Sequence, residues 1–174
     1  TDTIFITEPP YEGIEKRRDK NKMKMLLRSL ARNESAIVGN KTIIKDIEEY
    51  EKGTDLLSSR DTVIDYLDVL DRLHLIENQD AYAENYRSPA RVGKSPKKHL
   101  TDPSLSCACL GLTPEKLLKD VKTFGFMFEA LVERDLRIYM DYLDGHLYHF
   151  RDNVTGLEVD SILEFSDGEY AAIE

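Results

Sequence analysis

The segment 156–174 (GLEVDSILEFSDGEYAAIE) restricts the fold most, because its residues alternate as they do in an acidic β-hairpin. Successive residues of a strand point to opposite faces of the sheet. The largely apolar face would hold Leu157, Val159, Ser161, Leu163 and Phe165, and the other face Glu158, Asp160, Ile162 and Glu164. The sequence therefore predicts strands at 157–165 and 169–174 that carry acids close to each other.

The turn at 166–168 decides which residue of the second strand faces Asp160. If the turn is a three-residue loop with Gly168 left-handed, Asp160 lies directly opposite Glu174. A two-residue loop would instead place Glu174 opposite Ser161, on the wrong face. Directly opposed Cβ atoms are about 4.5–5.5 Å apart, which lets two carboxylates hold one hard divalent cation. The predicted metal site thus requires the three-residue turn or a bulge.

A third acid belongs to the strongest helical pattern of the chain, residues 125–143. The apolar residues that recur with the helical period are Phe128, Leu131, Val132, Leu136, Tyr139 and Leu143. Glu129 lies between Phe126 and Val132 on a largely apolar face of this helix. An acid there is costly to bury unless it is paired, hydrogen-bonded or near a cation. A boundary glutamate that reaches solvent is the alternative.

The net charge of −9 is distributed unevenly along the chain. Residues 1–100 hold 18 basic and 18 acidic residues, whereas residues 101–174 hold 6 basic and 15 acidic residues. This division predicts two modules that meet near residue 100. An acidic module is a poor match for nucleic-acid phosphates unless bound cations offset its charge.

The first module, residues 20–86, is predicted to contain three short helices and a small hairpin. The predicted elements are helices at 23–30, 41–50 and 62–75 and an alternating, turn-rich stretch at 78–86. Asn40 and Ser59 are the expected N-caps of the second and third helices. This order is that of a winged helix, a helix-turn-helix variant.

The third predicted helix carries acids where a DNA-reading helix carries basic residues. These acids are Asp61, Asp65, Asp68 and Asp71. Because they repel phosphate, the pattern favours a protein contact or a structural role for this helix.

The segment 87–99 (RSPARVGKSPKKH) is the best candidate for contact with nucleic acid. Its five basic residues are Arg87, Arg91, Lys94, Lys97 and Lys98, and it contains no acid. The alternative is an extended linker with solvated charges, because prolines and a glycine interrupt the segment. The sequence does not favour one of these two interpretations over the other.

Composition and motifs exclude several other classes of protein. No apolar run approaches the ~20 residues of a membrane span, and the first residues lack the basic and then apolar regions of a signal peptide. Cys107 and Cys109 are too few for a disulfide framework or a structural zinc site, which favours reduced thiols in the cytoplasm. The histidines lie in no nucleophile motif, and His146 and His149 most simply decorate a strand. Residues 1–19 are expected to be a linker or a remnant of an upstream domain.

A helix with Glu129, a strand, a strand with Asp160 and a strand ending at Glu174 resemble the PD-(D/E)xK nuclease core, whose topology is αβββαβ. The resemblance implies that Asp160 and Glu174 hold Mg²⁺, that Glu129 joins them, and that all three are catalytic and metal-binding residues. It also implies a lysine at position 176, beyond the last residue of the chain. The implied fold class is α+β, with a winged-helix module followed by a truncated restriction-endonuclease-like αβββ core at 100–174.

Longer runs carry a closer resemblance, to the C-terminal region of a bacterial and archaeal family of AAA-type ATPases. They are KKHLTDPSLSCACLGL at 97–112, GFMFEALVERDLR at 125–137 and FRDNVTGLEVDSILEFSDGEYAAIE at 150–174. The resemblance implies a P-loop ATPase domain upstream of Thr1, followed by the winged helix and the nuclease-like domain. Nothing like G-x-x-x-x-G-K-[ST] occurs in the chain, so ATP is expected only in that upstream domain.

Two functions are therefore expected, and different features favour each. The first is a Mg²⁺-dependent DNA nuclease or nucleic-acid-binding role, which Glu129, Asp160 and Glu174 favour. The second is a non-catalytic region that contacts protein partners or self-associates, which the acidic residues of 101–174 favour. Little cleavage is expected from this chain alone, because position 176 and the closing elements of the core lie outside it.

Overall fold

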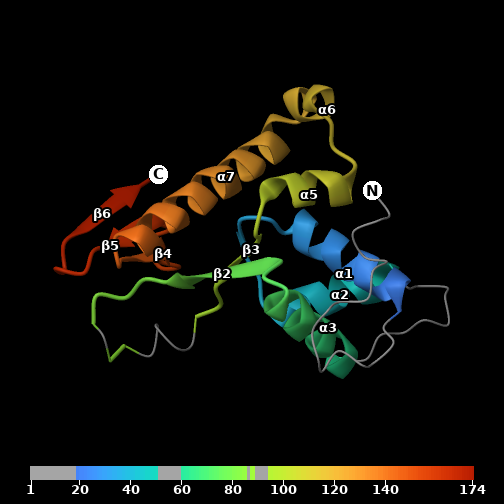
Figure 1. The fold of residues 1–174 in the computed structure, drawn as a ribbon, viewed down its shortest axis with the longest axis horizontal. Helices are drawn as coiled ribbons and strands as arrows, with labels where there is room; N and C mark the ends of the chain where they lie inside the picture. The colour runs from blue at the N-terminus through green and yellow to red at the C-terminus, as the bar shows by residue number, and fades with distance from the viewer. Residues whose placement is uncertain (1–18, 51–59, 86, 89–93) are drawn as a thin grey trace.

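The computed structural model describes residues 19–50, 60–85, 87–88 and 94–174, which form a mixed α+β fold (Figure 1). The helices are α1 (Lys20–Arg32), α2 (Asn40–Tyr50), α3 (Arg60–Arg72), α5 (Pro103–Leu110), α6 (Pro114–Lys119) and α7 (Val121–Tyr142). The strands are β1 (Ala36–Ile37), β2 (Ile76–Ala81), β3 (Lys97–Leu100), β4 (His146–Arg151), β5 (Glu158–Glu164) and β6 (Tyr170–Ile173). The α+β class predicted from the sequence is confirmed.

Within the described residues, six strands form one open sheet in the order β1-β3-β2-β4-β5-β6. Strands β1, β3 and β2 are antiparallel, as are β4, β5 and β6. A short parallel pairing of β2 with β4, Asp80 with Tyr148 and Ala81 with His149, joins the two groups. The sheet therefore continues across the predicted boundary near residue 100, and β2 is common to both halves.

Helices α1, α2 and α3 pack together beside the β1–β3–β2 end of the sheet and enclose the main apolar core (Figure 1). The core consists of Leu26, Leu27, Leu30, Ala31, Ile43, Ile47, Val63, Tyr66, Leu67, Leu70, Ile76 and Leu100. Helix α2 begins at Asn40, one residue before the expected start, so that Asn40 lies within the helix rather than at its N-cap, whereas Ser59 lies outside the described residues. Helix α3 ends at Arg72 rather than near residue 75, because His74 has a φ of 53° and turns the chain into β2.

The predicted basic linker differs most from the structure. Lys97–Leu100 form β3, the middle strand of the antiparallel group, which pairs with β1 on one side and β2 on the other. The prediction of an extended linker over the whole of 87–99 is therefore wrong at its last three residues, because Lys97 and Lys98 pair on both edges and His99 pairs with β2. Residues 89–93 of that segment lie outside the described residues.

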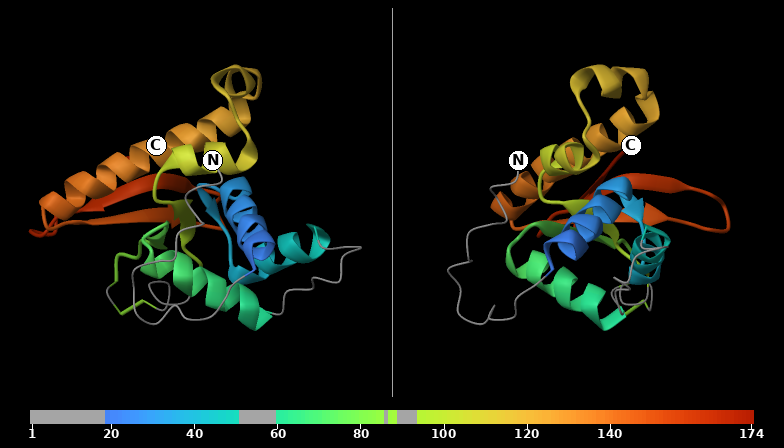
Figure 2. Two further views of the ribbon diagram at one scale, coloured as in Figure 1. Left: turned by 45° about the vertical axis from the view of Figure 1, so that its right-hand side comes forward. Right: turned by 90° about the vertical axis from the view of Figure 1, so that its right-hand side faces the viewer.

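Helix α7 extends along one face of the strands β4 to β6, as the left view of Figure 2 shows. It begins at Val121 rather than Gly125, because Asp120 caps it: the Asp120 carboxylate accepts a hydrogen bond from the Thr123 backbone N–H at 3.1 Å. Helix α5 was not expected; Asp102 caps it and Pro103 occupies its first position. No described helix has both the length and the apolar composition of a membrane span.

The apolar stripe predicted on α7 does not form the buried face of the helix. Phe128, Leu131, Tyr139 and Leu143 are exposed. The buried residues of α7 are instead Met127, Ala130, Glu133 and Met140. Glu133, the polar residue among them, contacts His99 of β3, and this pairing offsets the cost of burying its charge.

Candidate functional site

The β5–β6 turn has the three-residue form that the metal-site prediction requires. The Phe165 backbone N–H donates to the Glu169 carbonyl at 2.8 Å, and Gly168 has a left-handed φ of 87°. The next pairs are Glu164 with Tyr170 and, further along, Ser161 with Ile173. This register places Glu174, directly after β6, across from Asp160.

A β-bulge lies at Asp160. Tyr148 of β4 pairs with Ile162 and Phe150 pairs with Val159, so that Asp160 and Ser161 together face His149. A bulge bends its strand and redirects side chains, which is why bulges are frequent beside functional sites. Beside the bulge the expected alternation of apolar and exposed faces fails: Ser161, Ile162 and Leu163 are all buried, so both faces of β5 are covered there.

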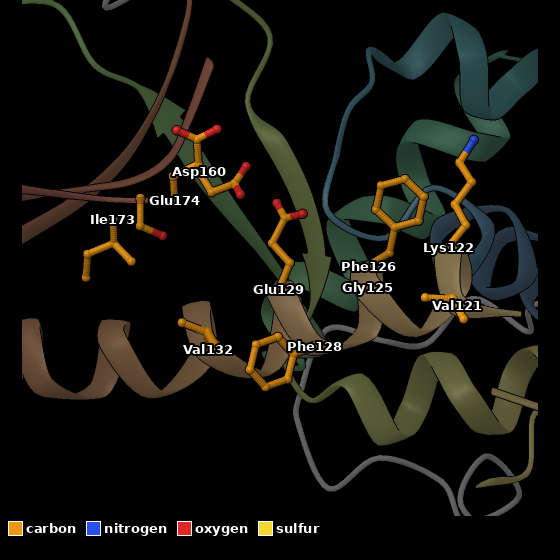
Figure 3. A pocket seen from close by; sticks show the side chains of 11 residues that line it. Val121, Lys122, Gly125, Phe126, Phe128, Glu129, Val132, Asp160, Ile173 and Glu174 are labelled. Carbon is orange, nitrogen blue, oxygen red and sulfur yellow. The ribbon is translucent and has the colours of Figure 1, made fainter. Parts of the chain in front are cut away.

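The three predicted acids line one cavity of about 520 Å³ between α7 and the ends of β5 and β6. In Figure 3, the carboxylates of Glu129, Asp160 and Glu174 gather at one end of this cavity, whereas Lys122 lies at the other end. Val121, Phe126, Phe128, Val132 and Ile173 supply its apolar walls. The structure therefore brings together the acids that the sequence analysis selected.

Lys97 of β3 is the cation that neutralises part of this acidic group. Its Nζ atom lies 2.7 Å from Glu129 Oε1 and 2.9 Å from Asp160 Oδ1, and the residue is only 2% exposed. The two carboxylate oxygens therefore lie within two hydrogen-bond lengths of each other. Burial opposes the charged form of Lys97, but Glu129 and Asp160 more than offset this effect and raise the pKa of its ammonium.

Glu129 is half-buried, and the pairing with Lys97 is what the sequence analysis required of a buried acid on this helix. Burial raises the pKa of Glu129, and the nearby charge of Asp160 acts in the same direction, while Lys97 opposes both effects. The alternative of a glutamate that simply reaches solvent does not hold, because its Oε1 atom is bonded to a buried lysine.

His99, two residues after Lys97 on β3, makes a second buried contact with α7. Its Nε2 atom contacts Glu133 of α7, and its Nδ1 atom lies 3.1 Å from Glu34 Oε1. Burial alone would lower the pKa of His99, but Glu133 and Glu34 outweigh it and the pKa is raised. Glu133 also pairs with Arg137, whose guanidinium lies 3.2 Å from Glu77 of β2.

These contacts form a two-rung ion-pair ladder between β3 and α7, with the rungs Lys97–Glu129 and His99–Glu133. Residues two apart on a strand share a face and are separated by about 6.6 Å. Residues four apart on a helix also share a face and are separated by about 6 Å along the axis. Because the two spacings match, both rungs form at once and set the position of α7 along β3.

Two further polar side chains are buried on the strands around Lys97. Gln79 of β2 donates through Nε2 to the Asp160 carbonyl at 2.9 Å and to the Tyr148 carbonyl at 3.2 Å. Among the described residues, its Oε1 atom has no hydrogen-bond partner. His149 is 1% exposed, and burial, followed by the charge of Lys97, lowers its pKa to about 4. His149 is therefore neutral, and it is a core residue rather than strand decoration.

The donor set fits a hard divalent cation in chemistry and charge, but not as a ready coordination sphere. Three carboxylates and one ammonium leave two negative charges, and carboxylate oxygens are the ligands that Mg²⁺ prefers. Lys97 contacts one oxygen of Glu129 and one of Asp160; within the described part of the chain, the second oxygen of each has no protein donor. However, no three His, Cys, Asp or Glu side chains of the described residues are close enough to form a metal-binding group.

The residues expected to contact nucleic acid do not form a continuous surface. Lys97 is buried in the acidic site, so its assignment to phosphate binding at the surface is corrected. Lys98 points to the other face of β3, where its Nζ atom lies 3.0 Å from Asn78 Oδ1. Lys94 is exposed and donates to the Arg151 carbonyl at 3.1 Å. Arg87 is exposed, and Arg91 lies outside the described residues.

The family model of a domain of unknown function, DUF8612, matches residues 12–116 of the chain. The chain belongs to the DUF8612 family. The match covers the helical half, β3 with Lys97 and His99, and α5, and it ends before α7. No curated protein and no solved structure matches the chain. Of the acidic site, the DUF8612 match therefore includes only the lysine, and the three carboxylates lie beyond it.

Sequence reasoning missed Lys97, His99 and His149 as members of this site. A signal for two of them was present: Lys97 and His99 are two apart, and Glu129 and Glu133 are four apart. Either spacing is common on solvated strands and helices, so it indicates an ion-pair site only when the strand and the helix are known to pack together.

Proposed function

We propose that this chain is the C-terminal region of an AAA-type ATPase and that its carboxylate cavity is the core of a Mg²⁺-dependent DNA nuclease. The observation that carries the proposal is the convergence of Glu129, Asp160 and Glu174 on one cavity. The order α7-β4-β5-β6 supports a PD-(D/E)xK-like αβββ core. The order α1-β1-α2-α3-β2-β3, with antiparallel strands in the order β1-β3-β2, supports a winged helix before it.

In this proposal Asp160, Glu174 and Glu129 hold the divalent cation. Such a cation, when bound, polarises a phosphodiester and lowers the pKa of an attacking water. Lys97 keeps Glu129 and Asp160 facing each other, and the bulge at Asp160 directs its side chain toward α7.

The first test is the binding of Mn²⁺, which replaces Mg²⁺ at carboxylate sites, measured by isothermal titration calorimetry. The wild-type chain is expected to bind one Mn²⁺, and Asp160→Asn to weaken this binding by about tenfold or more, because it removes a ligand charge. Glu169→Gln is the matched control, since Glu169 is an exposed acid of the same hairpin outside the cavity. Equal affinity in Asp160→Asn and wild type would reject the cavity as the cation site.

The second test is cleavage of plasmid DNA with Mg²⁺ by the longer chain that includes position 176 and the upstream ATPase. Asp160→Asn is expected to abolish cleavage that the wild type and Glu169→Gln retain. If wild type and Asp160→Asn cleave equally, the nuclease proposal fails.

A non-catalytic interaction region is the second candidate, and the outer face of α7 favours it. Phe128 is 56% exposed and Tyr142 89% exposed, with Phe124, Leu131, Ile138, Tyr139 and Leu143 also exposed on this helix. Clustered exposed apolar side chains are typical of surfaces that another polypeptide covers. If the wild-type chain does not bind Mn²⁺ and the longer chain does not cleave DNA, these results would favour this second function.

A further inference from the structure

The outer face of α7 carries a stripe of exposed apolar side chains, which we call the α7 stripe. Its residues are Val121, Phe124, Phe128, Leu131, Ile138 and Tyr142. They are spaced alternately three and four residues apart, with Asp135 at the one position of this pattern that is not apolar. Such a seven-residue repeat is the pattern with which one helix packs lengthwise against another. We propose that the α7 stripe is a homodimer interface, in which α7 of one copy packs antiparallel against α7 of a second copy.

The size of the stripe exceeds that of an ordinary surface patch. Its side chains are between 37% and 89% exposed, and the rings of Phe124 and Phe128 stack on each other with their centroids 6.4 Å apart. At about 200 Å² for a large apolar side chain, they expose roughly 700 Å², whereas the largest patch of a typical monomer is about 300–600 Å². Two copies that bury most of this surface lose roughly 1,200 Å², which is enough for a specific interface.

The length of the stripe identifies α7 itself as the partner. Helix α7 has 22 residues, which corresponds to a length of about 33 Å. The other helices in the described part of the chain have 13 residues or fewer. Of the described helices, only α7 of a second copy can therefore cover the stripe from one end to the other.

The charges of α7 permit this pairing and set its direction. Asp135 is paired with Arg134 of the same helix at 2.8 Å, so the stripe has no net charge although the chain carries −9. Lys122 lies in the first turn, which contains no acid, and Asp141 lies in the last turn, which contains no base. Apart from the Asp120 cap, each end thus carries a charge of the same sign as the helix macrodipole there, which is unfavourable. An antiparallel second copy brings ends of opposite charge together.

Sedimentation equilibrium of the 174-residue chain tests the homodimer. Interfaces of this size have dissociation constants of roughly micromolar or tighter, so the wild type at about 100 µM is expected to show twice the 20.0 kDa mass of one chain. Ile138→Glu places a charge in the stripe and is expected to weaken dimerisation by about tenfold or more.

Val154→Glu is the matched control, because Val154 is an apolar residue outside α7 that is 93% exposed. It is expected to dimerise as the wild type does, and circular dichroism should show an unchanged fold in both variants, since both side chains are exposed. A wild-type chain that stays monomeric overturns the proposal, and so does equal dimerisation of the two variants.

The direction of pairing has a separate test. A spin label on Asp141→Cys, in a chain with Cys107 and Cys109 replaced by alanine, marks the C-terminal end of α7. The antiparallel dimer places the two labels roughly 30 Å apart, because they lie at opposite ends of the helix pair. A distance near the ~10 Å between packed helix axes, measured by electron paramagnetic resonance, would overturn the antiparallel arrangement.

This inference is independent of the cation-binding function and names the partner for the surface that favours the second candidate function. Ile138 does not line the carboxylate cavity, so Ile138→Glu is expected to keep the Mn²⁺ affinity of the wild type. A dimer that binds no Mn²⁺ would support the inference and reject the cation site. Mn²⁺ binding by a wild-type monomer would do the reverse.

Discussion

Two buried histidines of the same sheet, His99 and His149, have pKa values shifted in opposite directions. His99 contacts Glu34 and Glu133, which hold its pKa above the ordinary value. His149 is buried near Lys97, its two ring nitrogens have no hydrogen-bond partner among the described residues, and its pKa falls to about 4. The difference arises from the partners of each ring rather than from burial, because both residues are almost fully buried.

These shifts predict opposite effects on stability at acidic and alkaline pH. Below pH 6.5, which is the ordinary pKa of histidine, His149 binds a proton in the unfolded state but stays neutral in the folded state. Its contribution therefore destabilises the fold progressively as the pH falls from about 6.5 toward 4, by up to about 3 kcal/mol. We expect His149→Gln to flatten this acidic limb, measured as the free energy of unfolding in urea at several pH values.

His99→Gln is the matched variant for the alkaline side. The stability contributed by His99 is fully present below its unfolded pKa and is lost as the pH rises through the raised folded pKa. Its replacement should lower stability at pH 6, reduce the loss at higher pH and leave the acidic limb unchanged. An acidic limb of equal slope in wild type and His149→Gln would contradict the assignment.

At the scale of elements, the β5–β6 hairpin is defined by its turn and its bulge. Gly168 adopts a positive φ that L-residues with a Cβ atom disfavour, and this turn sets the register that brings Asp160 toward Glu174. The bulge is a tertiary feature, since it forms where β5 pairs with β4. The conformation of β5 is therefore set by the local turn at its C-terminal end and by pairing with β4 at its N-terminal end.

Gly168→Ala is expected to destabilise the protein by about 1–2 kcal/mol, because the left-handed backbone costs roughly this much for a residue with a Cβ atom. Gly125→Ala is the control. Gly125 lies inside α7 without a positive φ, and a Cβ there meets no atom within 4 Å. This control should stabilise the protein by about 0.5–1 kcal/mol through helix propensity. Urea denaturation measures both, and an equal response of the two variants would contradict the turn assignment.

At the scale of the whole molecule, the two halves form one connected structure. The sheet passes from one half to the other through β2 and β4, and the ion-pair ladder attaches α7 to β3. Glu133 is central to this attachment, because it contacts His99 on β3 and Arg137 on its own helix while being only 3% exposed. The helical half of the chain therefore supports the acidic cavity.

Glu133→Gln is expected to destabilise the protein by about 3–5 kcal/mol, since it removes one of the two carboxylates that contact buried His99 and the partner of Arg137 on α7. Amide hydrogen exchange should show similar losses of protection in α1 and in β5, because both halves unfold together. Asp135→Asn, two positions along the same helix and paired with neighbouring Arg134, should cost no more than about 1 kcal/mol. Loss of protection confined to β4, β5 and β6 would show instead that the halves are independent.

The sequence by itself determined the features that depend on neighbouring residues. These include the alternating strands at 157–165 and 169–174 and the helix that carries Glu129, whereas the choice between a two-residue and a three-residue turn at 166–168, and with it the approach of Asp160 to Glu174, was left open. The requirement that Glu129 have a partner could also be stated in advance, because the cost of burying a charge does not depend on the fold.

The tertiary structure alone decided which partner Glu129 found and which face of α7 became buried. Lys97 and Glu129 are 32 residues apart, and their contact exists only because β3 lies under α7. In sequence, Lys97 is one basic residue in a run of five, indistinguishable from Lys98. Pairing on both edges of β3 turned one of these lysines inward and the other outward, and long-range pairing of this kind leaves no periodic signal in the chain.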